Sequence, residues 1–238
     1  MSTTITQQQP NQVRKSNAVT ILFRAVLLTF LLGITGSTQL FAQLTGTKTI
    51  PGDYATITAA VTDLNTVGVG AGGVIFEIAP GYTETLTGRI NLTATGTATD
   101  QIVFRKDPSG SGANPLLTAH VGVATATSAT MDGMWSLTGS DYVTIENINF
   151  TDPNTLTNTV MMEYAIGLFK ASATDGASNN TIKGCTITLN RNNVTAPTSG
   201  PAFQGSNGIT LLSCTPTTMQ TTLTVTAASR SEEHTSEL

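Results

Sequence analysis

Hydrophobic and polar residues alternate through the middle of the chain, and the alternation changes phase once. The apolar positions are Val143, Ile145, Ile148 and Phe150, and the step from Ile145 to Ile148 is one residue longer than the others. Successive side chains of a strand point to opposite faces, so an unbroken strand would turn Ile148 away from Ile145. A corner at Asn147 keeps all four side chains on one side. This segment therefore predicts one coil of a β-solenoid.

Two later segments repeat the pattern. Asn180–Ile187 aligns with Val143–Phe150 without a gap and places Gly184 at the corner, and Ile209–Cys214 fits the same frame with Ser213 there. Asn, Gly and Ser accept a tight bend at little cost. Repeated coils of this kind predict an all-β, right-handed parallel β-helix, and a β-sandwich with short strands is the alternative. The expected inward stack consists of Ile145, Ile182 and Leu211.

A short amphipathic helix is expected before the first coil. Between Tyr54 and Leu64 the apolar residues recur at helical spacing, and Asp53 is the expected N-cap. A helix with one apolar stripe can cover the open end of a solenoid. The stripe consists of Ile57, Ala60, Val61 and Leu64.

A glycine-rich segment, Gly68–Gly73, follows this helix and formally matches a dinucleotide-binding pattern. Phosphate binding requires a helix after the loop, whereas here the strand Val74–Ile78 follows, so we interpret the segment as a helix-to-strand turn. Ile90–Leu92 and Ile102–Phe104 are further expected strands, and Pro108–Pro115 is an expected loop.

Both ends of the 238-residue chain differ from its middle. Basic residues precede an apolar run, Ala25–Ile34, that is too short to cross a bilayer comfortably. We expect residues 1–42 to be a signal peptide cleaved after Ala42, with an uncleaved signal anchor as the alternative. The charged segment Arg230–Leu238 matches the translation of a common sequencing adapter, so we interpret residues 230–238 as a library artefact; a genuine acidic tail is the alternative. Residues 43–229 would then be the N-terminal part of a longer β-helix domain.

The charge pattern excludes some partners. The chain has 15 Asp and Glu against 11 Lys and Arg, with no basic cluster in the expected mature part. Nucleic acid and anionic membrane surfaces are therefore not expected partners, and the mature chain has no expected membrane span.

Three segments together resemble a known superfamily: Tyr54–Leu64, Gly73–Glu84 and Gly139–Phe150. They are similar to the N-terminal part of right-handed parallel β-helix proteins of the pectin lyase-like superfamily, and most similar to bacterial surface proteins that leave the cell by type IX secretion. The resemblance covers about Thr45–Thr215 and concerns structural motifs, so it supports the fold better than any activity. It implies a protein that is secreted or held at the outer cell surface.

The resemblance also implies where catalysis would be sought, because enzymes of this superfamily use clustered Asp residues or Asp-bound calcium with a basic Arg. None of the candidates lies in a recognisable catalytic motif, and a lone His120 cannot form a triad or a zinc site. We therefore assign no catalytic, cofactor-binding or metal-binding residue and expect no cofactor. The candidates are Asp132, Asp141, Asp152, Asp175 and Arg191.

The two cysteines, Cys185 and Cys214, fall at matching positions of aligned segments. They form either a disulfide or two free thiols, and the sequence leaves both open.

Two functions are compatible with these observations. The favoured one is a non-enzymatic surface protein that acts as a stalk or binds polysaccharide or another cell-surface component. The alternative is a truncated polysaccharide lyase or glycoside hydrolase.

Overall fold

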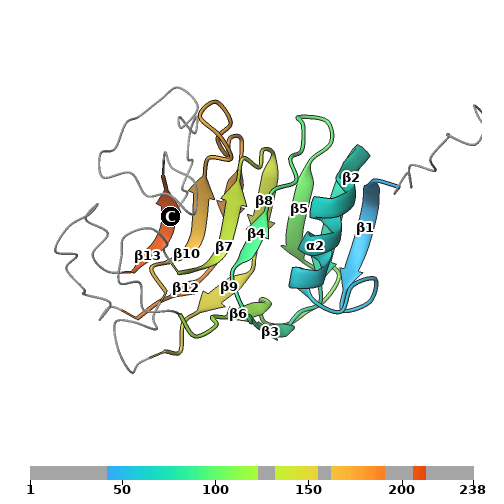
Figure 1. The fold of residues 1–238 in the computed structure, drawn as a ribbon. Helices are drawn as coiled ribbons and strands as arrows, with labels where there is room; N and C mark the ends of the chain where they lie inside the picture. The colour runs from blue at the N-terminus through green and yellow to red at the C-terminus, as the bar shows by residue number, and fades with distance from the viewer. Residues whose placement is uncertain (1–41, 123–131, 155–161, 191–205, 213–238) are drawn as a thin grey trace, which may run out of the picture. The chain divides into compact units, whose positions relative to one another are not determined.

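The computed structural model describes residues 42–122, 132–154, 162–190 and 206–212. This part of the chain is mostly β-structure, with one helix, α2 (Ile57–Val67), and three sheets whose paired strands are all parallel (Figure 1). Sheet A contains β1 (Leu44–Ile50), β2 (Val69–Ile78), β5 (Ile102–Lys106), β8 (Val143–Glu146) and β11 (Thr181–Lys183). Sheet B contains β3 (Thr83–Thr85), β6 (Leu116–Thr118), β9 (Asn149–Thr151) and β12 (Ile187–Thr188). Sheet C contains β4 (Ile90–Leu92), β7 (Gly133–Thr138), β10 (Tyr164–Phe169) and β13 (Asn207–Leu211).

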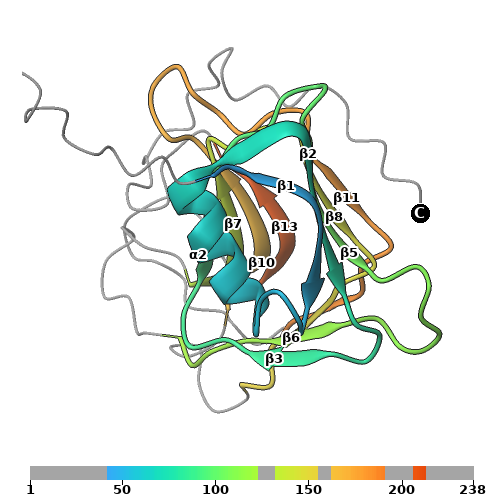
Figure 2. The same cartoon turned by 90° about the vertical axis from the view of Figure 1, so that its right-hand side faces the viewer.

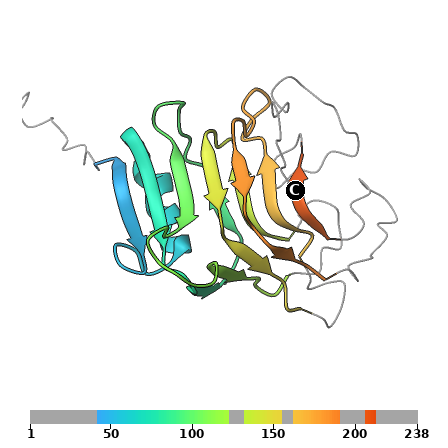
Figure 3. The same ribbon diagram turned by 180° about the vertical axis from the view of Figure 1, so that it is seen from behind.

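The chain visits the three sheets in a fixed order. From β2 onward, each strand of sheet A is followed by one of sheet B and then one of sheet C. In Figure 3 the strands of sheet A lie side by side in chain order, from β1 in blue to β8 in yellow. Each round of three strands is called a layer below, so the layers are β2–β4, β5–β7, β8–β10 and β11–β13. The expected all-parallel β-structure with a single helix is confirmed for the described residues.

The corner predicted at Asn147 is present. Asn147 has a φ of 55°, and the four apolar side chains around it are at most 1% exposed. In the next layer Gly184 has a φ of 63° at the same place, and a Cβ added there would clash with the side-chain oxygen of Asn147. Ile182 pairs with Ile145, and Ile187 pairs with Phe150. The gapless alignment of these two segments is therefore correct.

The third member of the predicted stack is wrong. Leu211 lies in β13 of sheet C, where it pairs with Leu168 and not with Ile182. The error has a physical cause: in all three sheets, alternate residues of a strand point to the shared interior. The same short apolar pattern therefore occurs in each sheet and does not specify which sheet a segment joins.

Sheets A and C share one hydrophobic interior. Phe76 of β2 and Phe104 of β5 are register partners, and their rings stack at 4.5 Å with an angle of 11° between planes. The ring of Trp135 in β7 meets Phe104 edge-on at 5.0 Å. These three side chains are fully buried, so in-register stacking and contact across the interior are made by the same residues.

Helix α2 buries the stripe expected from the sequence: Ile57, Ala60, Val61 and Leu64. Its N-cap is Thr56, whose hydroxyl accepts a hydrogen bond from the amide of Ala59, and not Asp53 as predicted. Asp53 instead accepts hydrogen bonds from the amide and hydroxyl of Thr49 in the preceding turn. Both residues are good caps by type, and the turn after β1 decides between them.

Two side chains join α2 to the first strands of sheets B and C. The Glu84 carboxylate of β3 accepts hydrogen bonds from the amides of Ile57 and Thr58 at 2.8 and 3.2 Å. Asn65 donates to the carbonyl of Asn91 in β4 at 2.7 Å, and its oxygen accepts from two amides just after that strand. Figure 2 shows α2 and β1 together at this end of the sheets. The helix therefore covers strand edges as well as apolar side chains, which is the covering role predicted for it.

The prediction of a helix-to-strand turn for the glycine-rich segment is wrong, because the segment forms the first half of β2. Only Gly68 belongs to the helix end, where its amide donates to the carbonyl of Leu64 at 2.8 Å. Gly73 has a φ of 76°, and an added Cβ there would lie 2.5 Å from the carbonyl oxygen of Gln101. The glycines allow β2 to approach the neighbouring backbone closely.

Within the described ranges, no helix combines the length and apolar character needed to cross a bilayer.

Candidate functional site

The carboxylates predicted as candidates are divided between two places. Asp132 and Asp152 lie where the chain passes from sheet B to sheet C, whereas Asp141 and Asp175 lie where it passes from sheet C to sheet A. Arg191 lies outside the described residues. The structure therefore does not bring the four carboxylates into one cluster.

Asp141 links the passages from sheet C to sheet A in successive layers. Its Oδ1 accepts hydrogen bonds from the amide and hydroxyl of Ser178 at 2.7 and 2.6 Å, and its amide donates to the Thr95 hydroxyl at 3.0 Å. Asp175 is exposed and pairs through its backbone with Ser172 in a tight turn. These two residues act as turn residues, the role in which Asp is common.

Both carboxylate oxygens of Asp152 also accept hydrogen bonds from other residues of the chain. The residue is 7% exposed, and its Oδ1 accepts from the amide and side chain of Asn154 at 3.0 and 2.6 Å. Its Oδ2 accepts from the amide of Met162 at 2.8 Å. Both oxygens therefore organise the passage from sheet B to sheet C.

Ionisable side chains from three layers meet at this passage. The corner cluster consists of Arg89, His120, Asp132, Glu163 and Tyr164. Arg89 donates to the Tyr164 hydroxyl at 3.3 Å, although the two residues lie 75 positions apart in sequence. Glu163 accepts from the amide of Asp132 at 2.5 Å, and the Asp132 carbonyl accepts from the amide of Glu163 at 2.9 Å. The connections from sheet B to sheet C after β6, β9 and β12 cover residues 119–132, 152–163 and 189–206, and each is longer than the passage from A to B in the same layer.

Burial shifts the pKa values of two members of the corner cluster toward their neutral forms. It lowers the pKa of His120, and the negative charges of Asp132 and Asp152 only oppose that shift. It raises the pKa of the Tyr164 phenol to about 12, against the positive charge of Arg89. His120 Nδ1 is buried, with no hydrogen-bond partner among the described residues. Burial and the nearby Arg89 charge both favour the neutral imidazole of His120, which leaves a nitrogen lone pair available as an acceptor at this place.

Most of this cluster is not recognisable from the sequence. His120 has no second histidine nearby with which to form a known site, and Arg89, Glu163 and Tyr164 belong to no motif. Arg89 and His120 each follow a short strand of sheet B, β3 or β6, but neither strand is predicted from the sequence.

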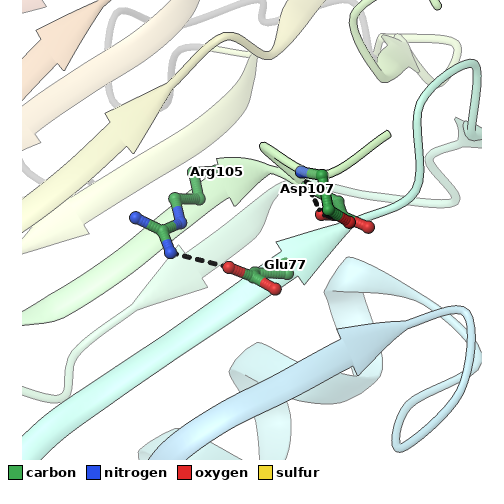
Figure 4. Close-up of polar contacts among 4 residues, drawn as sticks. Glu77, Arg105 and Asp107 are labelled. Atoms are coloured by element: carbon green, nitrogen blue, oxygen red, sulfur yellow. Dashed lines mark hydrogen bonds and ion pairs between the residues drawn. The ribbon is translucent and has the colours of Figure 1, made fainter. Parts of the chain in front are cut away.

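The outer face of sheet A carries a row of alternating charges. Glu77, Arg105, Glu146 and Lys183 are successive register partners. Arg105 pairs with Glu77 at 2.6 Å, as Figure 4 shows, and Lys183 pairs with Glu146 at 3.2 Å. Nearby, Asp107 accepts from the amide and hydroxyl of Ser109. These charges satisfy one another between strands.

The outer face of sheet B carries a row of threonines instead. Thr85, Thr118, Thr151 and Thr188 are successive register partners, and we call them the threonine row. Thr85 and Thr188 are exposed, and Thr118 and Thr151 are half-buried. None of these hydroxyls hydrogen-bonds to another residue in the described ranges. The inward positions between them hold side chains such as Leu117 and Phe150.

Neither metal binding nor a disulfide gains support from the geometry. Among the residues that could be searched, no group of three or more His, Cys, Asp or Glu is placed to hold a metal ion. Cys185 is a half-buried free thiol whose pKa is raised by burial, and Cys214 lies outside the described residues. The predicted matching positions of the two cysteines are not supported, because Ile209–Leu211 lies in sheet C and Cys185 follows a strand of sheet A. A disulfide and two free thiols therefore both stay open for this pair.

The chain was compared with protein-family models, with curated proteins and with solved structures, and none of these comparisons gives a match.

Proposed function

We propose that this chain is the N-terminal part of an exported right-handed parallel β-helix of the pectin lyase-like type, and that the β-helix is a non-catalytic platform for neutral glycans at the outer cell surface. The in-register layers of sheets A, B and C support the fold. The expected signal peptide supports export, with type IX secretion as the expected route.

The observation that carries glycan binding is the threonine row. Parallel strands lie about 4.8 Å apart, so the row presents a hydroxyl and a methyl group at that interval. A hydroxyl both donates and accepts hydrogen bonds, and a methyl group packs against the apolar face of a sugar ring. The neighbouring outward positions of sheet B are Thr83, Leu116 and Asn149, which are also uncharged. An uncharged face of this kind suits a neutral ligand better than an acidic one.

The other faces suit a ligand less well. On sheet A the charged side chains already pair between strands. On sheet C the corresponding outward row includes Ser136 and Thr210, which are 0% and 6% exposed. Within the described ranges, sheet B is therefore the face on which accessible hydroxyls without protein partners continue through four successive strands.

Retention of the full chain on insoluble polysaccharides tests this proposal. We expect retention on neutral polymers such as cellulose or xylan and little on polygalacturonate. The double variant Thr118→Asp/Thr151→Asp should lose retention, because it places two charges on the face. The matched variant Thr144→Asp/Thr181→Asp alters an outward register pair of sheet A and should bind normally. Equal retention of the two variants would refute the assignment to sheet B, and no retention of the unaltered chain would refute glycan binding.

A polysaccharide-cleaving enzyme is the second candidate, and the corner cluster is the observation that favours it. Arg89, His120 and Tyr164 bring a cation and two proton-exchanging groups together. An enzyme would release unsaturated or reducing sugars from pectin-like polymers, and His120→Gln should abolish that release. Absence of products from the full chain favours the platform.

A further inference from the structure

Strands β11, β12 and β13 form one end of the three sheets, which we call the open end. In the described part of the chain, each of these strands pairs only with the strand of the preceding layer. Unpaired strand edges present free backbone donors and acceptors and act as templates for another strand.

Apolar side chains that are buried in inner layers become exposed at the open end. Ile166 and Leu168 of β10 are 0% and 2% exposed, whereas their partners Ile209 and Leu211 in β13 are 48% and 40% exposed. Likewise Ile145 and Phe150 are buried, and their partners Ile182 and Ile187 are half-buried. Among the described residues, these side chains occupy core positions with a register neighbour on one side only.

The opposite end is closed. There β1 pairs along β2, and α2 binds the first strands of sheets B and C through Glu84 and Asn65. A second copy would bring only the outer edge of β1, in sheet A, and no free edge for sheets B and C, because α2 is bonded to their first strands at that end. A docking partner must therefore bring free strand edges of its own.

We propose that the open end binds a polypeptide segment that adds in parallel to β11 and β12 as two short strands joined by a corner. The register defines its chemistry. It needs apolar residues opposite Ile182 and Ile187 and, opposite Gly184, a residue that accepts a positive φ, such as Asn or Gly. The segment Val143–Phe150 meets these requirements on the other side of the same strands, so the partner is another coil of this pattern.

The contacts between layers show how such a segment would be held. The amide of Asn147 donates to the carbonyl of Lys183 at 2.9 Å, and that of Phe150 donates to the carbonyl of Thr186 at 2.8 Å. Backbone bonds therefore continue through the corner from one strand to the next. A docked coil repeats these bonds and covers the apolar side chains in the same step. The inference rests on this register and not on glycan binding.

Binding of a synthetic peptide to the full chain tests the proposal. A fluorescent peptide copying residues 141–152 should bind saturably, as measured by anisotropy. A control peptide carrying Ile145→Asp, Ile148→Asp and Phe150→Asp should bind at least about tenfold more weakly, because each change removes one buried apolar contact. This comparison uses the unaltered protein, so it does not depend on whether a variant folds.

Protein variants then locate the site. Ile187→Lys should weaken peptide binding by about tenfold or more, since it places a charge at a core position. Thr186→Lys, an exposed neighbour, should not weaken it. Equal binding of the two peptides, or no binding, would overturn the proposal. Sedimentation showing a dimer that the peptide does not displace would also overturn it, because a second copy would then occupy the open end.

Discussion

Replacing Glu84 by alanine removes the acceptor that joins β3 to the start of α2. The carboxylate is 8% exposed and accepts from the amides of Ile57 and Thr58 and from the hydroxyls of Thr58 and Tyr82. In Glu84→Ala the amide of Ile57 stays buried without its partner, which costs about 1–3 kcal/mol. Loss of a negative charge at a helix N-terminus adds about 0.3–1 kcal/mol. We therefore expect the free energy of unfolding to fall by about 1–4 kcal/mol.

Urea unfolding followed by tryptophan fluorescence measures this change. The chain has one tryptophan, Trp135, and its side chain is fully buried, so its emission reports the interior between sheets A and C. Glu84→Gln keeps one acceptor oxygen and should fall between the native chain and Glu84→Ala. Asp53→Ala is the control, because Asp53 is exposed and bonds only within its own turn, and its effect should be much smaller. Equal effects of Glu84→Ala and Asp53→Ala would refute the covering role of α2.

Three further predictions concern the corners, the charged row and pH. Asn147→Val should destabilise the fold by about 1–3 kcal/mol in urea unfolding, because a β-branched residue tolerates the φ of 55° poorly, whereas Asn147→Gly should be close to neutral. Arg105→Met should lower stability by about 1 kcal/mol or less, with a smaller loss in 1 M salt, because its ion pair with Glu77 is partly exposed and screened. Because burial lowers the pKa of His120 from 6.5, the unfolded state binds more protons below about pH 6.5, so the melting temperature should fall as pH drops through that value. His120→Gln should reduce this slope, and an unchanged slope would contradict the burial of the imidazole.

Local features of the fold could be predicted from the sequence because they depend on neighbouring residues. The corner at Asn147 follows from a single change of phase in the apolar pattern, and Gly184 takes the same place in the next layer. The buried stripe of α2 follows from helical spacing in the same way. The N-cap could not be predicted in this way. Asp53 and Thr56 are both suitable by type, and Thr56 takes the role because the Asp53 carboxylate is hydrogen-bonded to Thr49.

Features that depend on which sheet a segment joins could not be predicted. Leu211 has the same local pattern as Ile182 but lies in sheet C. The contact between Arg89 and Tyr164 spans 75 positions and forms only because both lie at the passage from sheet B to sheet C. The threonine row is likewise built from residues in four separate strands, and no local motif unites them.

The central claim is that successive layers stack in register, so that β11 lies beside β8. Thr144 and Thr181 are outward register partners, and cysteines at parallel partner positions are close enough to form a disulfide. In a chain with Cys185→Ser and Cys214→Ser, we expect Thr144→Cys/Thr181→Cys to cross-link under mild oxidation, as seen by mass spectrometry of the protease digest. Val103→Cys/Thr181→Cys, whose positions are separated by β8, should not cross-link. Cross-linking of the second pair without the first would contradict the stacked arrangement.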